Sequence, residues 1–416
     1  MAANEKSAKN ILIIKLSSIG DCLLATPAVE SIRKGYPGSF ITWLVEDRAK
    51  DIALLNPYVD EVLIIDKKKF KIGDYLALIK ELRSRRYDLS VDLQGVDRTS
   101  IFAFLSGAAS RYAEEYADLG FLSNRKIARK GRPLEHAVKF YLFLAENSGG
   151  GKINEPVLTL VSTEEDRKFA SDFLEKNFGK TEGLFIGINP TGTWKTKRWP
   201  LKYFTELSKK LLKTFNANIV IFGGKGEEYL ADEILDSLKT LCAADADEAA
   251  GAGKTADTVA DAGKTVLTAF GKKTEGKGTE GKKTEGKGTE GKKTEGKGTE
   301  GKIASAVGKT TLKQAKELLA RMNYFITPDS GLMHIASAID ELKTISLFGP
   351  TDPELTGPVG KNFTVLRDSL ICIPCFKKEC PLNKIENNNL KECVLCMKRI
   401  TPGLVFNIIK TDLESR

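Results

Sequence analysis

The chain has 416 residues, of which 41% are hydrophobic, and it carries a formal net charge of +9. This length exceeds one ordinary core, so we expect two domains, and the positive charge favours anionic partners such as phosphate, acidic lipid or nucleic acid. No segment approaches the roughly 20 apolar residues that cross a membrane, and the polar stretch Met1–Asn10 predicts no secretory signal. Seven cysteines without such a signal indicate the reducing cytoplasm rather than a disulfide scaffold.

The first half of the chain alternates between strand and helix patterns. Ile11–Leu16 is an almost continuous apolar run, as expected of a buried parallel strand, and we predict one helix from Cys22 to Lys34. Tyr75–Arg86 has the pattern of an amphipathic helix. Further strands are expected at Phe40–Val45, Val62–Ile65 and Leu89–Leu93. The alternation predicts a doubly wound α/β domain over residues 1–150.

Polar turns follow two of these strands. Ser17, Ser18 and Asp21 come after the first strand, while Gln94 and then Arg98 come after the strand at residues 89–93. Open α/β sheets bind ligands at the carboxyl ends of their parallel strands. We therefore expect the Asp21 carboxylate, at the head of the first helix, to lie on the ligand edge of the sheet.

Basic residues recur in the following segment and allow two interpretations. They form either a solvated face or a cradle for a phosphorylated or carboxylated acceptor. His136 begins a predicted helix, Glu135–Ala145, and is expected to be structural. The basic residues are Arg111, Arg125, Lys126, Arg129, Lys130 and Arg132.

A second α/β run is expected over residues 156–400. The glycine-rich stretch Asn147–Glu155 marks the boundary between the domains. Thr191–Lys197 follows a predicted strand, Leu184–Asn189, and its hydroxyl and ammonium groups suit a diphosphate. No complete dinucleotide fingerprint or P-loop is present. Other elements expected here are the helices Glu164–Asn177 and Lys202–Thr214 and the strand Asn218–Phe222.

The stretch Ala243–Lys302 differs from its surroundings. Its second part repeats the ten-residue unit GKKTEGKGTE three times from Gly271. Such a composition cannot bury a core, so we predict a disordered insertion in the second domain. A tether for nucleic acid or lipid is the alternative, although glutamates interrupt the lysines throughout. We expect order to resume at Thr311 and to continue in a helix over Leu312–Met322.

The stretch after this helix has the composition of a phosphate site. A strand is predicted at Tyr324–Thr327, a helix at Leu332–Ile339 and another strand at Thr344–Phe348. In the turn between the first two, Asp329 and Ser330 can cap the helix, and Gly331 lets backbone approach a ligand. Free N–H groups and the positive end of the helix dipole favour phosphate there. The alternative is that Asp329 and Ser330 are caps only.

The C-terminal region contains five closely spaced cysteines. We expect reduced thiols that pack a small subdomain and no metal. The alternative is a structural zinc site, which two C-x-x-C pairs with a fifth thiol between them would suit. A helix at Pro402–Leu413 is predicted to close the chain within residues 402–416. The five cysteines are Cys372, Cys375, Cys380, Cys393 and Cys396.

Six motifs, taken together and in this order, resemble glycosyltransferase family 9, the ADP-heptose:lipopolysaccharide heptosyltransferases. They span nearly the whole chain except the predicted insertion. The motifs are KLSSIGD from Lys15, DLQG from Asp92, KRWP from Lys197, FGG from Phe222, DSGLMH from Asp329 and FGPTDP from Phe348.

The resemblance implies a GT-B architecture, in which two Rossmann-like domains face a cleft. It further implies inverting, metal-independent transfer with Asp21 as the general base, and a donor ribose held by Glu227 or Glu228. The residues implied in donor binding are Thr193, Lys197, Glu227, Asp329, Ser330, Gly331 and His334. The residues implied on the acceptor side are Ser17, Ser18, Gln94 and Arg98.

The resemblance also implies the substrates. Heptose would move from ADP-heptose to the lipopolysaccharide inner core, with Kdo-lipid A or heptosyl-Kdo-lipid A as acceptor and no required cofactor. We expect a cytoplasmic monomer that rests on the inner face of the cytoplasmic membrane and binds no nucleic acid. The alternatives are another nucleotide-sugar or glycan acceptor, a non-catalytic nucleotide-sugar-binding protein, and a zinc-stabilised nucleic-acid module.

Overall fold

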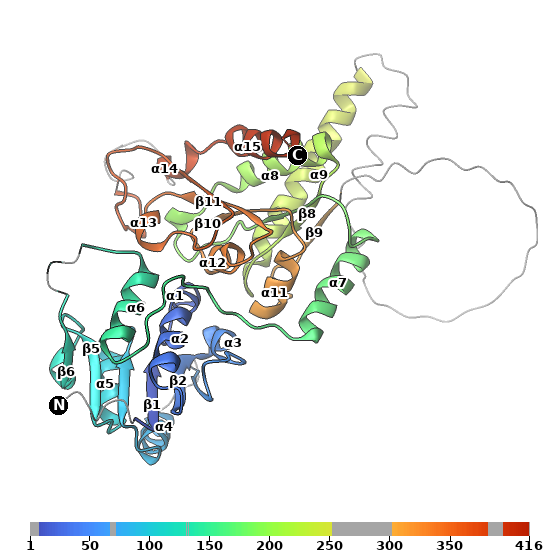
Figure 1. Ribbon diagram of the computed structural model, residues 1–416. Helices are drawn as coiled ribbons and strands as arrows, with labels where there is room; N and C mark the ends of the chain where they lie inside the picture. The colour runs from blue at the N-terminus through green and yellow to red at the C-terminus, as the bar shows by residue number, and fades with distance from the viewer. Residues whose placement is uncertain are drawn as a thin grey trace, which may run out of the picture.

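The computed structural model describes residues 8–66, 72–129, 131, 133–251, 302–381 and 394–415. In this part of the chain, two α/β domains stand against each other (Figure 1). Each domain is built on a sheet of six parallel strands. The α/β fold class predicted from the sequence is therefore confirmed.

The first domain contains β1 to β6 and α1 to α6. Its strands are β1 (Asn10–Ile14), β2 (Phe40–Glu46), β3 (Glu61–Ile65), β4 (Leu89–Asp92), β5 (Ser110–Glu114) and β6 (Arg125–Ile127). Its helices are α1 (Ile19–Leu24), α2 (Thr26–Gly35), α3 (Lys50–Ala53), α4 (Ile72–Ser84), α5 (Asp97–Leu105) and α6 (Ala137–Asn147), with short 3-10 turns η2 (Asp47–Ala49) and η3 (Gly120–Leu122).

The second domain contains the remaining elements. Its strands are β7 (Phe185–Ile188), β8 (Asn218–Ile221), β9 (Ile303–Ser305), β10 (Tyr324–Pro328), β11 (Lys343–Phe348) and β12 (Phe363–Arg367). Its helices are α7 (Glu164–Phe178), α8 (Leu201–Phe215), α9 (Glu228–Gly251), α11 (Leu312–Leu319), α12 (Gly331–Ser337), α13 (Pro353–Thr356), α14 (Leu395–Lys398) and α15 (Pro402–Glu414), with the 3-10 turn η4 (Lys195–Lys197).

The two sheets have the same topology. The first sheet has the order β3-β2-β1-β4-β5-β6, and the second has the order β9-β8-β7-β10-β11-β12 when it is read from β9. The strand order therefore reverses between β1 and β4 in one sheet and between β7 and β10 in the other. Ligands of doubly wound folds bind beyond the carboxyl ends of the strands at such switch points.

Helices α1 and α12 bring the two switch points together (Figure 1). α1 begins directly after the turn that follows β1, and α12 directly after the turn that follows β10. Two glycines allow this contact. A Cβ on Gly20 would lie 2.6 Å from His334 Cδ2, and one on Gly331 would lie 3.0 Å from Ile19 Cγ2. A side chain at position 20 would require His334 to shift, and one at position 331 would crowd Ile19.

The single helix predicted from Cys22 to Lys34 is wrong, because the structure has two helices that meet at Ala25. Pro27 is the cause. It has no N–H to donate to the carbonyl of Leu23, and its ring crowds that carbonyl. The Thr26 hydroxyl donates to the Leu23 carbonyl instead, at 2.7 Å.

The predicted start of the insertion, Ala243, is wrong, whereas its predicted end, Lys302, directly precedes β9. α9 continues to Gly251, in keeping with the alanine-rich sequence at that point. Order resumes before Thr311, because Ile303–Ser305 forms β9 beside β8. Three residues are too few to show a strand pattern. The repeats predicted to be disordered lie outside the described residues.

Three other strands, β5, β6 and β12, also escaped the sequence analysis. β5 and β6 carry several of the basic residues that could have formed an acceptor cradle.

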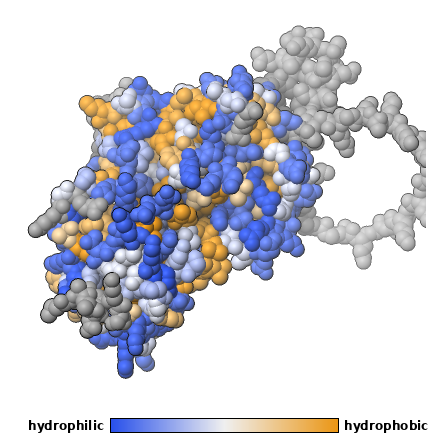
Figure 2. All heavy atoms as spheres, viewed as in Figure 1, coloured by the Kyte–Doolittle hydropathy of each residue, from blue (hydrophilic) through white to orange (hydrophobic). Residues whose placement is uncertain are grey.

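Hydrophilic side chains cover much of the face shown in Figure 2, with apolar ones interspersed. Within the described ranges, no helix combines the length and the apolar character needed to cross a membrane.

Candidate active site

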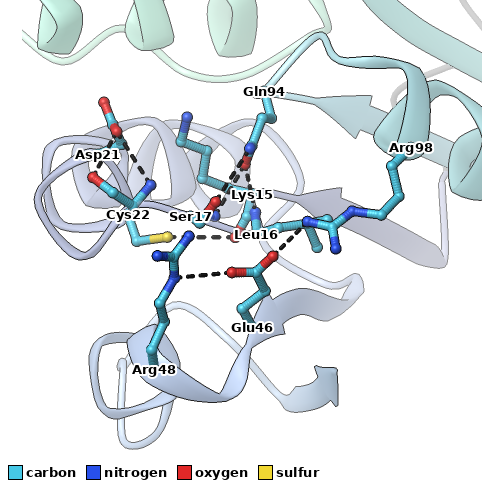
Figure 3. Close-up of polar contacts among 10 residues, drawn as sticks. Lys15, Leu16, Ser17, Asp21, Cys22, Glu46, Arg48, Gln94 and Arg98 are labelled. Atoms are coloured by element: carbon cyan, nitrogen blue, oxygen red, sulfur yellow. Dashed lines mark hydrogen bonds and ion pairs between the residues drawn. The ribbon is translucent and has the colours of Figure 1, made fainter. Parts of the chain in front are cut away.

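A glutamine side chain joins the two loops at the first switch point (Figure 3). Gln94 Oε1 accepts hydrogen bonds from the backbone N–H of Leu16 at 2.8 Å and of Ser17 at 3.0 Å. The buried Asp92 Oδ1 in turn accepts from the backbone N–H groups of Gln94 and Gly95, both at 2.9 Å. The predicted residues Ser17, Ser18 and Gln94 are therefore gathered at one edge of the sheet.

Asp21 lies at this edge, in the first turn of α1. Its Oδ2 accepts hydrogen bonds from the Ser18 backbone N–H at 3.1 Å and the Ser18 hydroxyl at 2.8 Å. Its Oδ1 accepts one from the Tyr141 hydroxyl at 3.2 Å, and Lys15 Nζ donates to that same hydroxyl oxygen at 2.9 Å. The sequence analysis identified neither Lys15 nor Tyr141 as a site residue.

Opposing influences act on the pKa of Asp21. Burial raises it, while the Lys15 ammonium, the Ser18 hydrogen bonds and the charge of His334 when protonated lower it; the net pKa is below the ordinary value. Asp21 is therefore ionised at neutral pH, which a general base requires. Burial also lowers the pKa of Lys15, but Asp21 opposes that effect.

Arg98 is paired with a buried carboxylate close to this edge (Figure 3). Glu46, the last residue of β2, has a side chain that is only 3% exposed and forms an ion pair with Arg98. Arg48 Nε lies 2.9 Å from the other oxygen of Glu46. Two guanidinium groups on one carboxylate leave a net positive charge. The sequence analysis missed Glu46 and Arg48, although a carboxylate at the end of a predicted strand was a usable signal.

A lysine and an aspartate form the centre of the second switch point. Lys197 Nζ lies 2.6 Å from Asp329 Oδ2, and the Thr351 hydroxyl donates to the same oxygen at 2.8 Å. Lys197 Nζ also lies 4.6 Å from the centroid of the Trp194 ring. Two predicted donor residues, from segments that follow β7 and β10, are thus brought into direct contact.

The prediction that both Asp329 and Ser330 cap α12 is only half right. Ser330 is the N-cap, with its hydroxyl accepting from Met333 N at 3.3 Å, whereas the Asp329 carboxylate turns to Lys197. A direct ion pair is stronger than a neutral cap bond. Gly331 is the first residue of the helix.

An asparagine joins the loops at this second switch point. Asn189 Nδ2 donates to the hydroxyls of Thr327 and Ser330, both at 3.0 Å, and Asn189 Oδ1 accepts from the Thr191 hydroxyl at 2.7 Å. The sequence analysis missed this residue, which was assigned only to the end of a predicted strand. Its role parallels that of Gln94 in the first domain.

The other predicted donor residues, Thr193, Glu227 and His334, come from three separate segments of the second domain. Thr193 is exposed on the loop before η4. Glu227 Oε2 accepts from Gly224 N at 2.9 Å, and Glu227 Oε1 lies 3.8 Å from Arg198. His334 is buried at the contact between the domains, and burial lowers its pKa to about 4. It is therefore neutral at physiological pH.

The basic residues of β5 and β6 do not form one cradle. Arg111 donates to the carbonyls of Leu122 at 2.9 Å and Ala108 at 2.8 Å, so it stabilises its own loop. The Arg129 guanidinium lies 5.1 Å from the centroid of the Phe140 ring. Arg125 and Lys126 are exposed on the edge strand β6, as in the solvated-face interpretation. Lys130 and Arg132 lie outside the described residues.

His136 is the N-cap of α6, which agrees with the expectation that this residue is structural.

Four of the five clustered cysteines fall within the described ranges. Cys372, Cys375 and Cys380 are partly exposed and Cys396 is buried. Burial raises the pKa of the Cys396 thiol to about 11, and the other three thiols add to that rise. In the described part of the chain, no three His, Cys, Asp or Glu side chains are arranged to hold a metal ion. Cys393 lies outside it.

Comparisons with known proteins identify the family of this chain. The family model for glycosyltransferase family 9 (heptosyltransferase) matches residues 75–256 and 281–386, which is more than half of the chain. Lipooligosaccharide heptosyltransferase 2 of Campylobacter jejuni is 25% identical over 395 residues, which cover 94% of this chain and 95% of that protein.

Two solved structures share the arrangement of the domains. The glycosyl transferase family 9 structure from Veillonella parvula has a TM-score of 0.69 and 20% identity, covering 98% of both chains. The E. coli ADP-heptose lps heptosyltransferase II has a TM-score of 0.66 and 20% identity, covering 97% of this chain and 98% of that one. The GT-B architecture expected from the sequence is confirmed.

Proposed function

The chain belongs to glycosyltransferase family 9, and from this premise we propose that it transfers heptose from ADP-heptose to the inner core of lipopolysaccharide. The names of its relatives support both substrates: one is a lipooligosaccharide heptosyltransferase and another an ADP-heptose lps heptosyltransferase. The observation that carries the proposal is the meeting of the two switch points across α1 and α12. One supplies an ionised carboxylate, Asp21, and the other a lysine, Lys197.

On the acceptor side, Asp21 is the general base. It removes the proton from an acceptor hydroxyl, whose oxygen then attacks the anomeric carbon of the donor. The bond between that carbon and the diphosphate breaks on the opposite face, so the configuration inverts and ADP leaves. Oδ1 is the oxygen suited to take the proton, because it accepts one hydrogen bond while Oδ2 accepts two.

On the donor side, Lys197 stabilises the negative charge that develops on the leaving diphosphate. Asp329 holds its ammonium in place, so little reorganisation is needed as the bond breaks. In this proposal the lysine supplies the positive charge, and no metal is required. Thr193, Ser330 and Gly331 are further phosphate contacts, and Glu227 holds the ribose. His334 lies on α12, against Gly20 of the first domain.

The acceptor itself is anionic and lipid-linked. Arg98 and Arg48, held by the buried Glu46, offer a net positive charge beside Ser17, Ser18 and Gln94, which suits the carboxylate of an acidic inner-core sugar. Kdo-lipid A or heptosyl-Kdo-lipid A are the proposed acceptors. The enzyme would work in the cytoplasm as a monomer, resting on the inner membrane surface without a nucleic-acid partner.

The test is direct turnover. The purified enzyme is incubated with ADP-heptose and Kdo-lipid A, or its heptosylated form, in buffer containing EDTA, and both ADP release and the mass of the lipid are measured. We expect the lipid to gain one heptose for each ADP released. Transfer from another nucleotide-sugar but not from ADP-heptose would contradict the donor assignment. Loss of transfer in EDTA with recovery on adding a metal would contradict the metal-free mechanism.

A further inference from the structure

We propose that Lys15 and Tyr141 are positioning residues that together set the charge state and the orientation of Asp21. The inference rests on the proposed role of Asp21 as the base and extends it to two residues that lie behind it. Both come from the first domain, Lys15 from the segment directly after β1 and Tyr141 from α6.

The hydrogen bonds have a fixed direction. Lys15 Nζ can only donate, and it donates to the Tyr141 oxygen at 2.9 Å. The hydroxyl keeps its single proton for another acceptor, and that acceptor is Asp21 Oδ1 at 3.2 Å. A chain of ammonium, hydroxyl and carboxylate therefore ends on the oxygen proposed to take the proton.

Burial of the Lys15 ammonium lowers the stability of the fold, so a role in packing alone does not explain this residue. The residue is 4% exposed, and a buried ammonium costs several kcal/mol unless it is paired. Within the described residues, its Nζ contacts one hydrogen-bond acceptor, the neutral Tyr141 hydroxyl, and no carboxylate lies within ion-pair distance. An apolar side chain would cost less there. The charge is therefore best explained by its effect on Asp21 through the intervening hydroxyl.

The other titratable groups around Asp21 do not replace this cation. His334 approaches from α12, but it is neutral above about pH 4. Burial raises the pKa of Cys22, on α1, to about 12, and burial also raises the pKa of Asp92, at the end of β4. The pKa of Tyr141 is also raised, chiefly by burial, so its hydroxyl stays protonated. Among these groups, Lys15 is therefore the positive charge that opposes the effect of burial on Asp21.

Removal of this charge should move the pH dependence of the reaction. In the parent enzyme, the acid limb of kcat/KM reports the ionisation of Asp21. In Lys15→Met, the partly buried carboxylate loses the cation that lowers its pKa, so the limb should move to higher pH by about one unit or more. In Tyr141→Phe, the charge stays but one hydrogen bond to the carboxylate is lost. The acid limb of kcat/KM should also move to higher pH in this variant, but by less than in Lys15→Met.

The experiment measures kcat/KM against pH for the parent, Lys15→Met, Tyr141→Phe and Lys139→Met. Lys139 is an exposed lysine on the same helix as Tyr141, so its variant is a matched control whose limb should not move. ADP affinity, measured by calorimetry, should stay within about twofold of the parent in every folded variant, since the donor binds the other domain. At pH values above its shifted acid limb, Lys15→Met should have kcat/KM close to that of the parent, because Asp21 is ionised there.

An unmoved acid limb in a Lys15→Met enzyme that binds ADP normally would overturn the inference. If Lys15→Met does not fold, Tyr141→Phe decides, and an unmoved limb there would overturn it equally. Asp21→Asn separates this failure from failure of the proposed base. If Asp21→Asn loses turnover while the limbs of the other variants do not move, only the inference fails. If Asp21→Asn turns over like the parent, both fail.

Discussion

The two switch points use the same kinds of side chain in opposite order. In the first domain, a carboxylate faces the other domain, and its lysine is buried behind it with a tyrosine between them. In the second domain, the lysine has a side chain that is 17% exposed, and it contacts its aspartate, which is 7% exposed, directly at 2.6 Å. The less buried partner of each pair is the one that the proposed reaction uses.

This difference follows from what each group must do. A base needs a high affinity for the proton, which a direct ion pair with Lys15 would reduce further, and the neutral Tyr141 hydroxyl separates the two charges. A cation that stabilises a leaving group needs a fixed position, and a direct ion pair with Asp329 supplies that. The same fold thus provides a proton acceptor in one domain and a charge clamp in the other.

The largest expected effect comes from the carboxylate of the first region. Asp21→Asn should lower kcat by roughly 10²–10⁴-fold, the usual contribution of a general base, and should leave ADP affinity nearly unchanged. Initial rates of ADP release and calorimetry with ADP measure the two effects separately. Asp172→Asn, at an exposed position on α7, is the control and should match the parent. A turnover close to that of the parent would remove Asp21 from the reaction.

The next effect concerns His334, which belongs to the second region but packs against Gly20 of the first. Burial lowers its pKa to about 4 from 6.5. Between pH 6.5 and pH 4, this histidine is protonated in the unfolded chain but neutral in the folded protein. The free energy of unfolding should therefore decrease as the pH is lowered from 6.5 to 4, by roughly 3 kcal/mol in all.

Urea unfolding of the parent and of His334→Gln at several pH values measures this contribution. The variant cannot bind the proton, so its stability should change less over this range than that of the parent. Equal slopes in the two proteins would show that His334 is not held neutral by the contact between the domains.

The cation of the second region should affect donor binding. Lys197→Ala removes a charge-assisted hydrogen bond to the diphosphate, which is worth about 1.5–3 kcal/mol, so ADP affinity should fall by roughly 10 to 100-fold. Lys195→Ala is the matched control: it removes an exposed lysine from the same turn, η4, and should have a smaller effect. If the two variants bind ADP equally well, Lys197 does not serve as the clamp.

The smallest effect is expected from deleting residues 252–301, none of which is a predicted site residue. Replacing them with a short Gly-Ser linker between α9 and β9 should change the melting temperature by no more than about 2 °C, since the repeats cannot bury a core and loop closure depends only weakly on length. ADP affinity should be unchanged. A large drop in melting temperature would show that this stretch contributes to the folded domain.

Local sequence patterns predicted the strands and the polar turns that form both switch points. Apolar runs gave the strands on each side of both switch points, and polar turns after them gave Asp21, Gln94, Lys197 and Asp329. The contacts between these residues depend on the fold. Tyr141 reaches Asp21 across 120 residues of sequence, and nothing near it in the sequence marks it as a partner. The role of Lys15 was equally hard to predict, because in the sequence it is a single polar residue at the end of an apolar strand.

The errors have local causes of a different kind. The break between α1 and α2 depends on one carbonyl that Pro27 cannot bond, which a helix pattern does not show. β9 is a short edge strand whose existence depends on pairing with β8. Asp329 was expected at a helix cap because its residue type favours caps, but a lysine from another segment offered it a stronger interaction.

The nucleotide that the second region binds tests the central claim most directly. Thermal unfolding is measured with ADP, UDP, GDP, CDP and dTDP, each at saturating concentration in EDTA. A nucleotide present at a hundred times its dissociation constant stabilises the folded protein by roughly 2.7 kcal/mol, which is readily detected. We predict a clear upward shift with ADP and little with the others. A selective shift with a different nucleotide, or none with ADP, would contradict transfer from ADP-heptose.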